Sequence, residues 1–188
     1  MPQTASGIVY PTSADNVDPP GDMQAMANSL EVIVSALLTP PAVRAYNNAG
    51  LSMANNTLTV IPLQAESSGM KTVASMHSTS SNTSRLVAPE NGVYTLSAMI
   101  SYAANATGRR VCQVRKNAAG SGLGGTQLHS VNIGPGPTSG TVVTFSDDIA
   151  LSANDYVEMF GYQLSGGALS VDAGEFNTAM SLHLVRYT

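Results

Sequence analysis

The closest match to a chemical motif in this sequence is a glycine-rich stretch, GSGLGG, at residues 120–125. Gly120, Gly122 and Gly125 have the spacing of a dinucleotide-binding loop, in which glycines let the backbone approach a pyrophosphate. Such a loop must open a helix whose N-terminus holds the phosphates. The next residues, 126–131, have the pattern of a strand instead. We therefore predict a hairpin loop here and no nucleotide site.

The histidines and the cysteine give no support for metal or nucleophile chemistry. His77, His129 and His183 are far apart, and none has the His-x-His or Cys-x-x-Cys spacing of a metal site. His183 alternates with leucines, which predicts an outward position on a strand. Cys112 alternates with Val114, which favours a buried thiol over a reactive one. We expect no cofactor and no metal.

Four acidic residues are the candidates for a catalytic pair: Asp147, Asp148, Asp172 and Glu175. A glycoside hydrolase needs two carboxylates placed across a sugar bond. Asp147 and Asp148 are neighbours on a predicted strand, so their side chains point to opposite faces. Asp172 and Glu175 flank a glycine in a predicted turn. These placements favour a protein that is not an enzyme.

Arg109 and Arg110 are adjacent cations at the start of a predicted strand. They could protect a sheet edge against aggregation, as charges do, or they could contact an anionic receptor such as a phosphorylated cell-wall polymer. The whole chain has eight Lys plus Arg and a net charge of -4. Phosphate backbones bind clustered cations, so we exclude nucleic acid as a partner.

The composition of the chain limits the kind of fold that can position these residues. Charged residues make up 11% of the 188, so the surface must be neutral and polar. One cysteine leaves no internal disulfide. The first residues lack the basic and apolar segments of a signal peptide, and no apolar run is long enough to cross a membrane. We expect a chain made in the cytoplasm that does not insert into a membrane.

Three segments follow one another along the chain. Residues 1–21 are rich in Pro, Ser, Thr and Asp and predict an extended arm. Residues 22–38 predict an amphipathic helix, which the prolines after Thr39 end. Its apolar seam repeats at spacings of three and four: Met23, Met26, Leu30, Ile33 and Leu37. This seam could dock on its own domain or on other copies of the chain, and we favour self-association around a short helical bundle.

Residues 39–188 form the third segment, in which short β-type runs alternate with Gly, Asn, Ser or Pro clusters. This spacing is typical of a mainly β, antiparallel sandwich or barrel. The runs are residues 55–63, 85–103, 109–117, 126–133, 140–151, 155–163, 168–174 and 178–187.

The run 155–163 is apolar on both faces, since Val157 and Met159 lie on one side and Tyr156, Phe160 and Tyr162 on the other. A strand in a sandwich needs only one apolar, buried face. The second face could be covered by a loop or arm of the same chain or by another subunit. We favour the subunit.

The order of the runs resembles the jelly-roll head shared by complement-type head domains and the tumour necrosis factor superfamily. APENGVYTLSAMISY (88–102) is similar to the family's Pro, Gly and Tyr strand pair, and CQVRKNAAG (112–120) to its strand ending in an Arg-x-Asn turn. IALSANDYVEMFGY (149–162) is similar to its Leu-x-x-Gly-Asp-x-Val strand, and TAMSLHLVRY (178–187) to its closing strand. The resemblance implies a homotrimer, with Tyr156, Phe160 and Tyr162 as candidates for contacts at the axis.

The arm and helix (6–33) resemble an N-terminal module of bacteriophage tail-fibre and minor tail proteins, in which a Tyr-Pro arm precedes a short helix. This implies attachment to the virion through Ile8, Val9, Tyr10 and Pro11. Together the resemblances imply a virion protein made in the host cytoplasm, a trimeric tail fibre or receptor-binding head that contacts other virion proteins and a host surface glycan. A capsid-attached head fibre or decoration protein is the alternative, and a polysaccharide depolymerase is the third.

Overall fold

The computed structural model describes residues 19–120 and 124–188, and the chain divides into two compact units between Pro40 and Pro41. In the first unit the structure describes one helix, α1 (Pro19–Leu38). The second unit, residues 41–188, is a β domain that we call the head. The predicted attachment residues Ile8, Val9, Tyr10 and Pro11 lie outside the described residues.

Helix α1 begins at Pro19, three residues before the start predicted at Asp22. Pro19 and Pro20 lie within the predicted extended arm, residues 1–21. A proline is tolerated in the first turn of a helix because the N–H that it lacks has no partner there. Pro19 and Pro20 therefore begin the helix, and it ends at Leu38, just before the next pair of prolines.

The apolar seam of α1 is exposed in the single chain. The exposed fraction is 67% for Met23, 43% for Leu30 and 68% for Leu37; Met26 is also exposed, and Ile33 is half-buried. In proteins, helices are stabilised mainly by packing an apolar face against another surface. The exposed seam is consistent with a missing partner, while the trimer itself stays a prediction.

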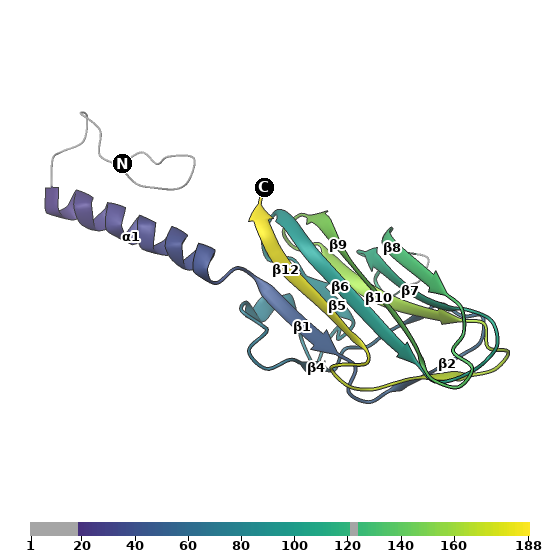
Figure 1. The fold of residues 1–188 in the computed structure, drawn as a ribbon. Helices are drawn as coiled ribbons and strands as arrows, with labels where there is room; N and C mark the ends of the chain where they lie inside the picture. The colour runs from purple at the N-terminus through teal and green to yellow at the C-terminus, as the bar shows by residue number, and fades with distance from the viewer. Residues whose placement is uncertain (1–18, 121–123) are drawn as a thin grey trace. The chain divides into compact units, whose positions relative to one another are not determined.

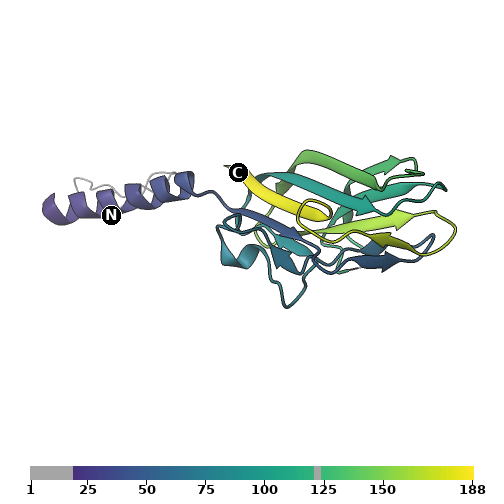
Figure 2. The same ribbon diagram turned by 60° about the horizontal axis from the view of Figure 1, so that its bottom comes forward.

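The head is a sandwich of two antiparallel sheets that lie face to face (Figures 1 and 2). The seven-stranded sheet contains, in spatial order, β2 (Leu51–Met53), β11 (Leu169–Val171), β6 (Gly92–Tyr102), β12 (Ala179–Tyr187), β1 (Ala42–Tyr46) and β4 (Ala65–Glu66), with β9 (Thr141–Leu151) paired to β6. The five-stranded sheet contains β3 (Thr59–Val60), β10 (Tyr156–Gln163), β7 (Arg110–Lys116) and β8 (Thr126–Ile133), with β5 (Arg85–Val87) paired to β10. A 3₁₀ turn, η1 (Ala74–Met76), lies between β4 and β5.

The core between the sheets follows from the alternation along β6. Leu96 and Ile100 are fully buried and face the other sheet, while Ser97 and Met99 on the opposite parity are half-buried on the outer face. The five-stranded sheet completes the core with residues such as Met159. Burying apolar area of this kind is the main favourable term in folding.

Strand β10 corrects one sequence prediction. Phe160 is fully buried within the single chain, so it cannot contact a neighbouring subunit. Its neighbour on the same face, Glu158, accepts hydrogen bonds from the Ser84 hydroxyl at 2.7 Å and from the Gly120 backbone N–H at 2.9 Å. Loops of the same chain therefore cover this face, which is the alternative that we had not favoured.

The head has two different ends. The first residue of β1, Ala42, pairs with His183 near the C-terminus, so the chain enters and leaves the head at the same end (Figure 1). β6 starts at this end, where Gly92 pairs with Tyr187, and it finishes at the other end with Tyr102. We call the first end the base and the second the distal end.

Candidate functional site

A shallow groove of about 380 Å³ lies on the outer face of the five-stranded sheet. On β7, Cys112 and Val114 face the core, so the alternating residues Val111 and Gln113 face outward into the groove. Seven residues line it: Leu58, Arg109, Val111, Gln113, Ser130, Asn132 and Tyr162. We call this surface the distal groove.

The lining residues are ordered by the pairing of three strands. Val111 on β7 pairs with Tyr162 on β10 and with Asn132 on β8, which makes one row across the sheet. Gln113 pairs with Ser130 on β8 and forms part of the next row. Neighbouring strands are about 4.8 Å apart, and every second residue along one strand is about 7 Å from the last. The two rows therefore cover roughly 10 Å across the strands and 7 Å along them.

Tyr102 fixes the floor of the groove from inside the core. Its hydroxyl donates a hydrogen bond to the Val111 carbonyl at 2.6 Å and accepts one from the Tyr162 N–H at 3.1 Å. Because Tyr102 ends β6, this bond places the groove at the distal end of the head. Burial raises the pKa of the Tyr102 hydroxyl well above its ordinary value, so the hydroxyl stays protonated and able to donate.

The two arginines predicted to contact a receptor differ in exposure. Arg109 is exposed at the groove, with its guanidinium carbon 5.4 Å from the centroid of the Tyr162 ring. Arg110 is fully buried, and its guanidinium donates to the backbone carbonyls of Thr107, Arg109 and Asn105. Burial lowers the pKa of Arg110. The prediction of a receptor contact is wrong for Arg110, which holds a loop, and stays open for Arg109.

The two tyrosines predicted at a subunit axis have partners within the chain. The Tyr162 hydroxyl donates to Asn56 Oδ1 at 2.6 Å. The Tyr156 ring lies 4.2 Å from the guanidinium carbon of Arg85, and its hydroxyl accepts a hydrogen bond from the Ala119 N–H. Both rings are half-buried. Their packing therefore needs no second subunit.

The acidic candidates for catalysis are kept apart. Asp148 accepts a hydrogen bond from the Thr95 hydroxyl at 2.6 Å, while Asp147 lies 3.3 Å from the His129 ring on the other face of the sheet. Opposite faces are what the sequence predicted for this pair. Asp172 accepts from the Ser101 hydroxyl at 2.7 Å, and Glu175 lies 3.9 Å from Arg44. Each carboxylate has a structural partner.

The sequence predicted neither a metal site nor a membrane-spanning segment. Within the described ranges, His, Cys, Asp and Glu side chains do not gather in any group of three that could hold a metal. Cys112 is buried, and burial raises the pKa of its thiol, which makes it a poor nucleophile. Among the described residues, α1 included, no helix has both the length and the hydropathy of a membrane span.

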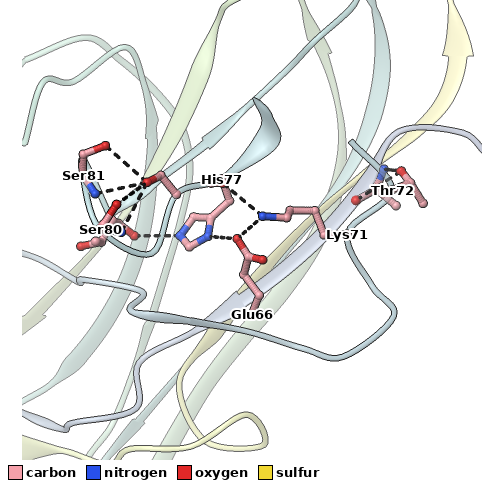
Figure 3. Close-up of polar contacts among 9 residues, drawn as sticks. Glu66, Lys71, Thr72, His77, Ser80 and Ser81 are labelled. Carbon is pink, nitrogen blue, oxygen red and sulfur yellow. Dashed lines mark hydrogen bonds and ion pairs between the residues drawn. The ribbon is translucent and has the colours of Figure 1, made fainter. Parts of the chain in front are cut away.

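A polar cluster that the sequence did not reveal ties the loop between β4 and β5 to strand β4 (Figure 3). Glu66 Oε1 lies 2.6 Å from Lys71 Nζ and 2.9 Å from His77 Nδ1. The buried His77 ring also lies 3.1 Å from the Thr83 carbonyl through Nε2. Both ring nitrogens face acceptors, so both bonds form together only when the ring carries two protons. Neither nitrogen is free for a metal.

This cluster predicts a contribution of Glu66 to stability that depends on pH. Burial raises the pKa of Glu66, but hydrogen bonds from Lys71 and His77 outweigh it and hold the pKa below its ordinary value of 4.5. The stabilisation is present above pH 4.5 and lost as the pH falls through the folded-state pKa. We expect Glu66→Gln to be less stable than the wild type at pH 6 and to lose less stability on acidification, as measured by urea denaturation. Equal losses in both proteins would contradict this.

No family model and no curated protein matches the sequence.

Comparison by structure gives matches to tumour necrosis factor and complement heads. The Eiger tumour necrosis factor of S. frugiperda matches with a TM-score of 0.57 and 12% identity, covering 79% of this chain and 94% of that chain. Murine APRIL matches with a TM-score of 0.56 and 8% identity, over 77% and 98%. The globular domain of zebrafish complement 1qA matches with a TM-score of 0.52 and 12% identity, over 79% and 99%. At these identities the likeness shows the fold, and the predicted jelly-roll sandwich is confirmed.

Proposed function

We propose that this protein is a non-enzymatic virion protein, a trimeric tail fibre or receptor-binding head that is attached through its N-terminal arm and contacts a host surface glycan. The observation that carries the proposal is that the head has an attached end and a free end. The chain enters at the base through Ala42, and the distal groove lies at the opposite end. A head held at its base presents this groove outward.

The exposed seam of α1 supports self-association. It bears large apolar side chains, and the 20 residues of α1 include just two ionisable side chains, those of Asp22 and Glu31. Residues Thr39 to Pro41 are the only link to the head, so Leu38 and Ala42 are at most roughly 14 Å apart. A bundle of α1 helices would therefore bring the β1 strands of the copies close together.

The outer face of the seven-stranded sheet is the surface of the head that fits this assembly. The side chains that face outward along β6 and β9 include Ser97, Met99, Thr144 and Ser146, and Val142 is half exposed. The Ser97 and Ser146 hydroxyls hydrogen-bond to each other at 2.9 Å, which lowers the cost of burying them. Asp148 on the same face accepts a hydrogen bond from the Thr95 hydroxyl. A contact on this sheet, in place of the one predicted on β10, leaves the distal groove open.

Virion incorporation and adsorption test the proposal. Deleting residues 1–21 is expected to abolish incorporation into the particle, as measured by mass spectrometry of purified virions, while the truncated chain still forms trimers. The purified full chain is expected to block adsorption of the parent phage to its host. Incorporation without block of adsorption would favour the capsid decoration alternative. Absence of the full chain from virions would overturn the proposal.

A further inference from the structure

We propose that the distal groove is a saccharide-binding site that takes one or two sugar rings bearing a negatively charged substituent. This deepens the proposed function, on which it rests for the glycan as a ligand class. It adds the residues that bind the glycan and the charge that they select. The groove offers free hydrogen-bonding groups, an apolar floor and a single cation.

Polar groups in the groove have unused hydrogen-bonding capacity. Within the described residues, the Asn132 amide and the Ser130 hydroxyl have no hydrogen-bond partner, and both side chains are exposed. Gln113 donates from Nε2 to Gln127 Oε1 at 2.6 Å, which leaves its own carbonyl oxygen free to accept. An amide both donates and accepts, as does a hydroxyl. This set matches the mixed donors and acceptors of neighbouring sugar hydroxyls.

The floor of the groove is apolar and lies among these polar groups. Val111 occupies its centre, between Tyr162 and Asn132 in the same row, and Leu58 forms part of the wall. Sugar rings present C–H faces that pack against aliphatic and aromatic side chains, while their edges form hydrogen bonds. A few polar groups around an apolar floor, in a volume of about 380 Å³, are typical of a small-ligand site.

The groove is held in place before any ligand binds. Tyr102 ties Val111 and Tyr162 together from below, and Asn56 holds the Tyr162 hydroxyl. A site with fixed walls loses less conformational freedom on binding, which favours affinity. The fixed backbone also sets the spacing of Asn132 relative to the floor.

Arg109 is the charged residue among those that line the groove. Its guanidinium stacks near the Tyr162 ring and forms no ion pair with a carboxylate of the described residues. One guanidinium can pair with one carboxylate or phosphate in a bidentate way. A single cation is too few for a polyanion such as nucleic acid. The geometry therefore favours a saccharide with one acidic group beside the bound rings.

An immobilised glycan array that contains neutral and acidic bacterial polysaccharides tests the proposal with the purified full chain. We expect binding to acidic glycans, weakened about tenfold or more by the pair Ser130→Ala and Asn132→Ala. Arg109→Gln is expected to remove the preference for the acidic form over its neutral counterpart. Thr126→Ala, exposed on the same strand but outside the groove, is the matched control and should leave binding unchanged.

Two results would overturn the saccharide site: binding to no glycan on the array, or binding that the groove variants leave unchanged. NMR amide shifts of Val111 and Asn132 on adding a bound oligosaccharide give an independent readout, and their absence would also overturn it. The failure of this proposal is distinguishable from that of the proposed function. If only the saccharide site is wrong, the groove variants block phage adsorption as well as the wild-type chain does. If only the proposed function is wrong, the groove still binds a glycan although the protein is absent from virions.

Discussion

Replacing Leu30 and Ile33 with aspartate in α1 is expected to convert the proposed trimer into monomers. Leu30 is 43% exposed in the single chain, and each such side chain gains about 1.5–3 kcal/mol on full burial. In a trimer the variant would place six carboxylates in an apolar bundle, where an unpaired charge costs several kcal/mol. Light scattering at micromolar concentration should report the monomer mass, with the β-sheet circular dichroism of the head unchanged.

The control for this variant adds the same charge to the other face of α1. Gln24 and Asn28 are exposed, and their side chains hydrogen-bond to each other at 2.8 Å. Gln24→Glu and Asn28→Asp should keep the trimer, because both residues lie away from the seam on the opposite face of the helix. A Leu30→Asp and Ile33→Asp variant that stays trimeric would contradict the helix bundle.

Replacing Gly161 with alanine is expected to cost the head about 2–4 kcal/mol of its free energy of unfolding. A Cβ at this position would lie 2.7 Å from the Tyr102 hydroxyl oxygen and 2.9 Å from Met53 Cε. The Met53 side chain can move, but the Tyr102 hydroxyl is held by its bonds to Val111 and Tyr162. Urea denaturation at a fixed protein concentration measures the loss, since assembly couples stability to concentration.

A double-mutant cycle tests whether the clash with the Tyr102 hydroxyl causes this loss of stability. Tyr102→Phe removes the hydroxyl and should itself cost about 1–3 kcal/mol, because it leaves the Tyr162 N–H without its bond. It also makes room for the added methyl, so Gly161→Ala with Tyr102→Phe should cost less than the sum of the two. Gly134→Ala is the control, because a Cβ there meets no atom within 4 Å. Strict additivity of the two changes would show that the clash is not with the hydroxyl.

Alternation and turn residues were sufficient to predict most of the sandwich. The run 126–133 coincides with β8, and 140–151 begins one residue before β9. The run 85–103, predicted as one β-type run, splits into β5 and β6 in different sheets. β1 and β2 were missed because each has five or fewer residues, too few for alternation to be distinctive. Pairing partners far along the chain, such as His183 for Ala42, define these strands.

The site was predictable only in part. The sequence singled out Arg109 and Tyr162, but it could not show that Arg110 points into a loop and that Phe160 is covered. Alternation along β10 indicated two apolar faces correctly and left open what covers the second. Asn132 was missed, because an exposed amide on a strand has no signal until the pairing with β7 places it beside Val111.

The mass of the purified full chain in solution is the most direct test of the central claim, which is that exposed apolar surface on α1 is buried between copies. One chain has a mass of 19.4 kDa, so three chains have 58.2 kDa. Light scattering at micromolar concentration should give the larger value. A stable monomer of 19.4 kDa, soluble with the α1 seam exposed, would contradict the trimer and the assembly built on it.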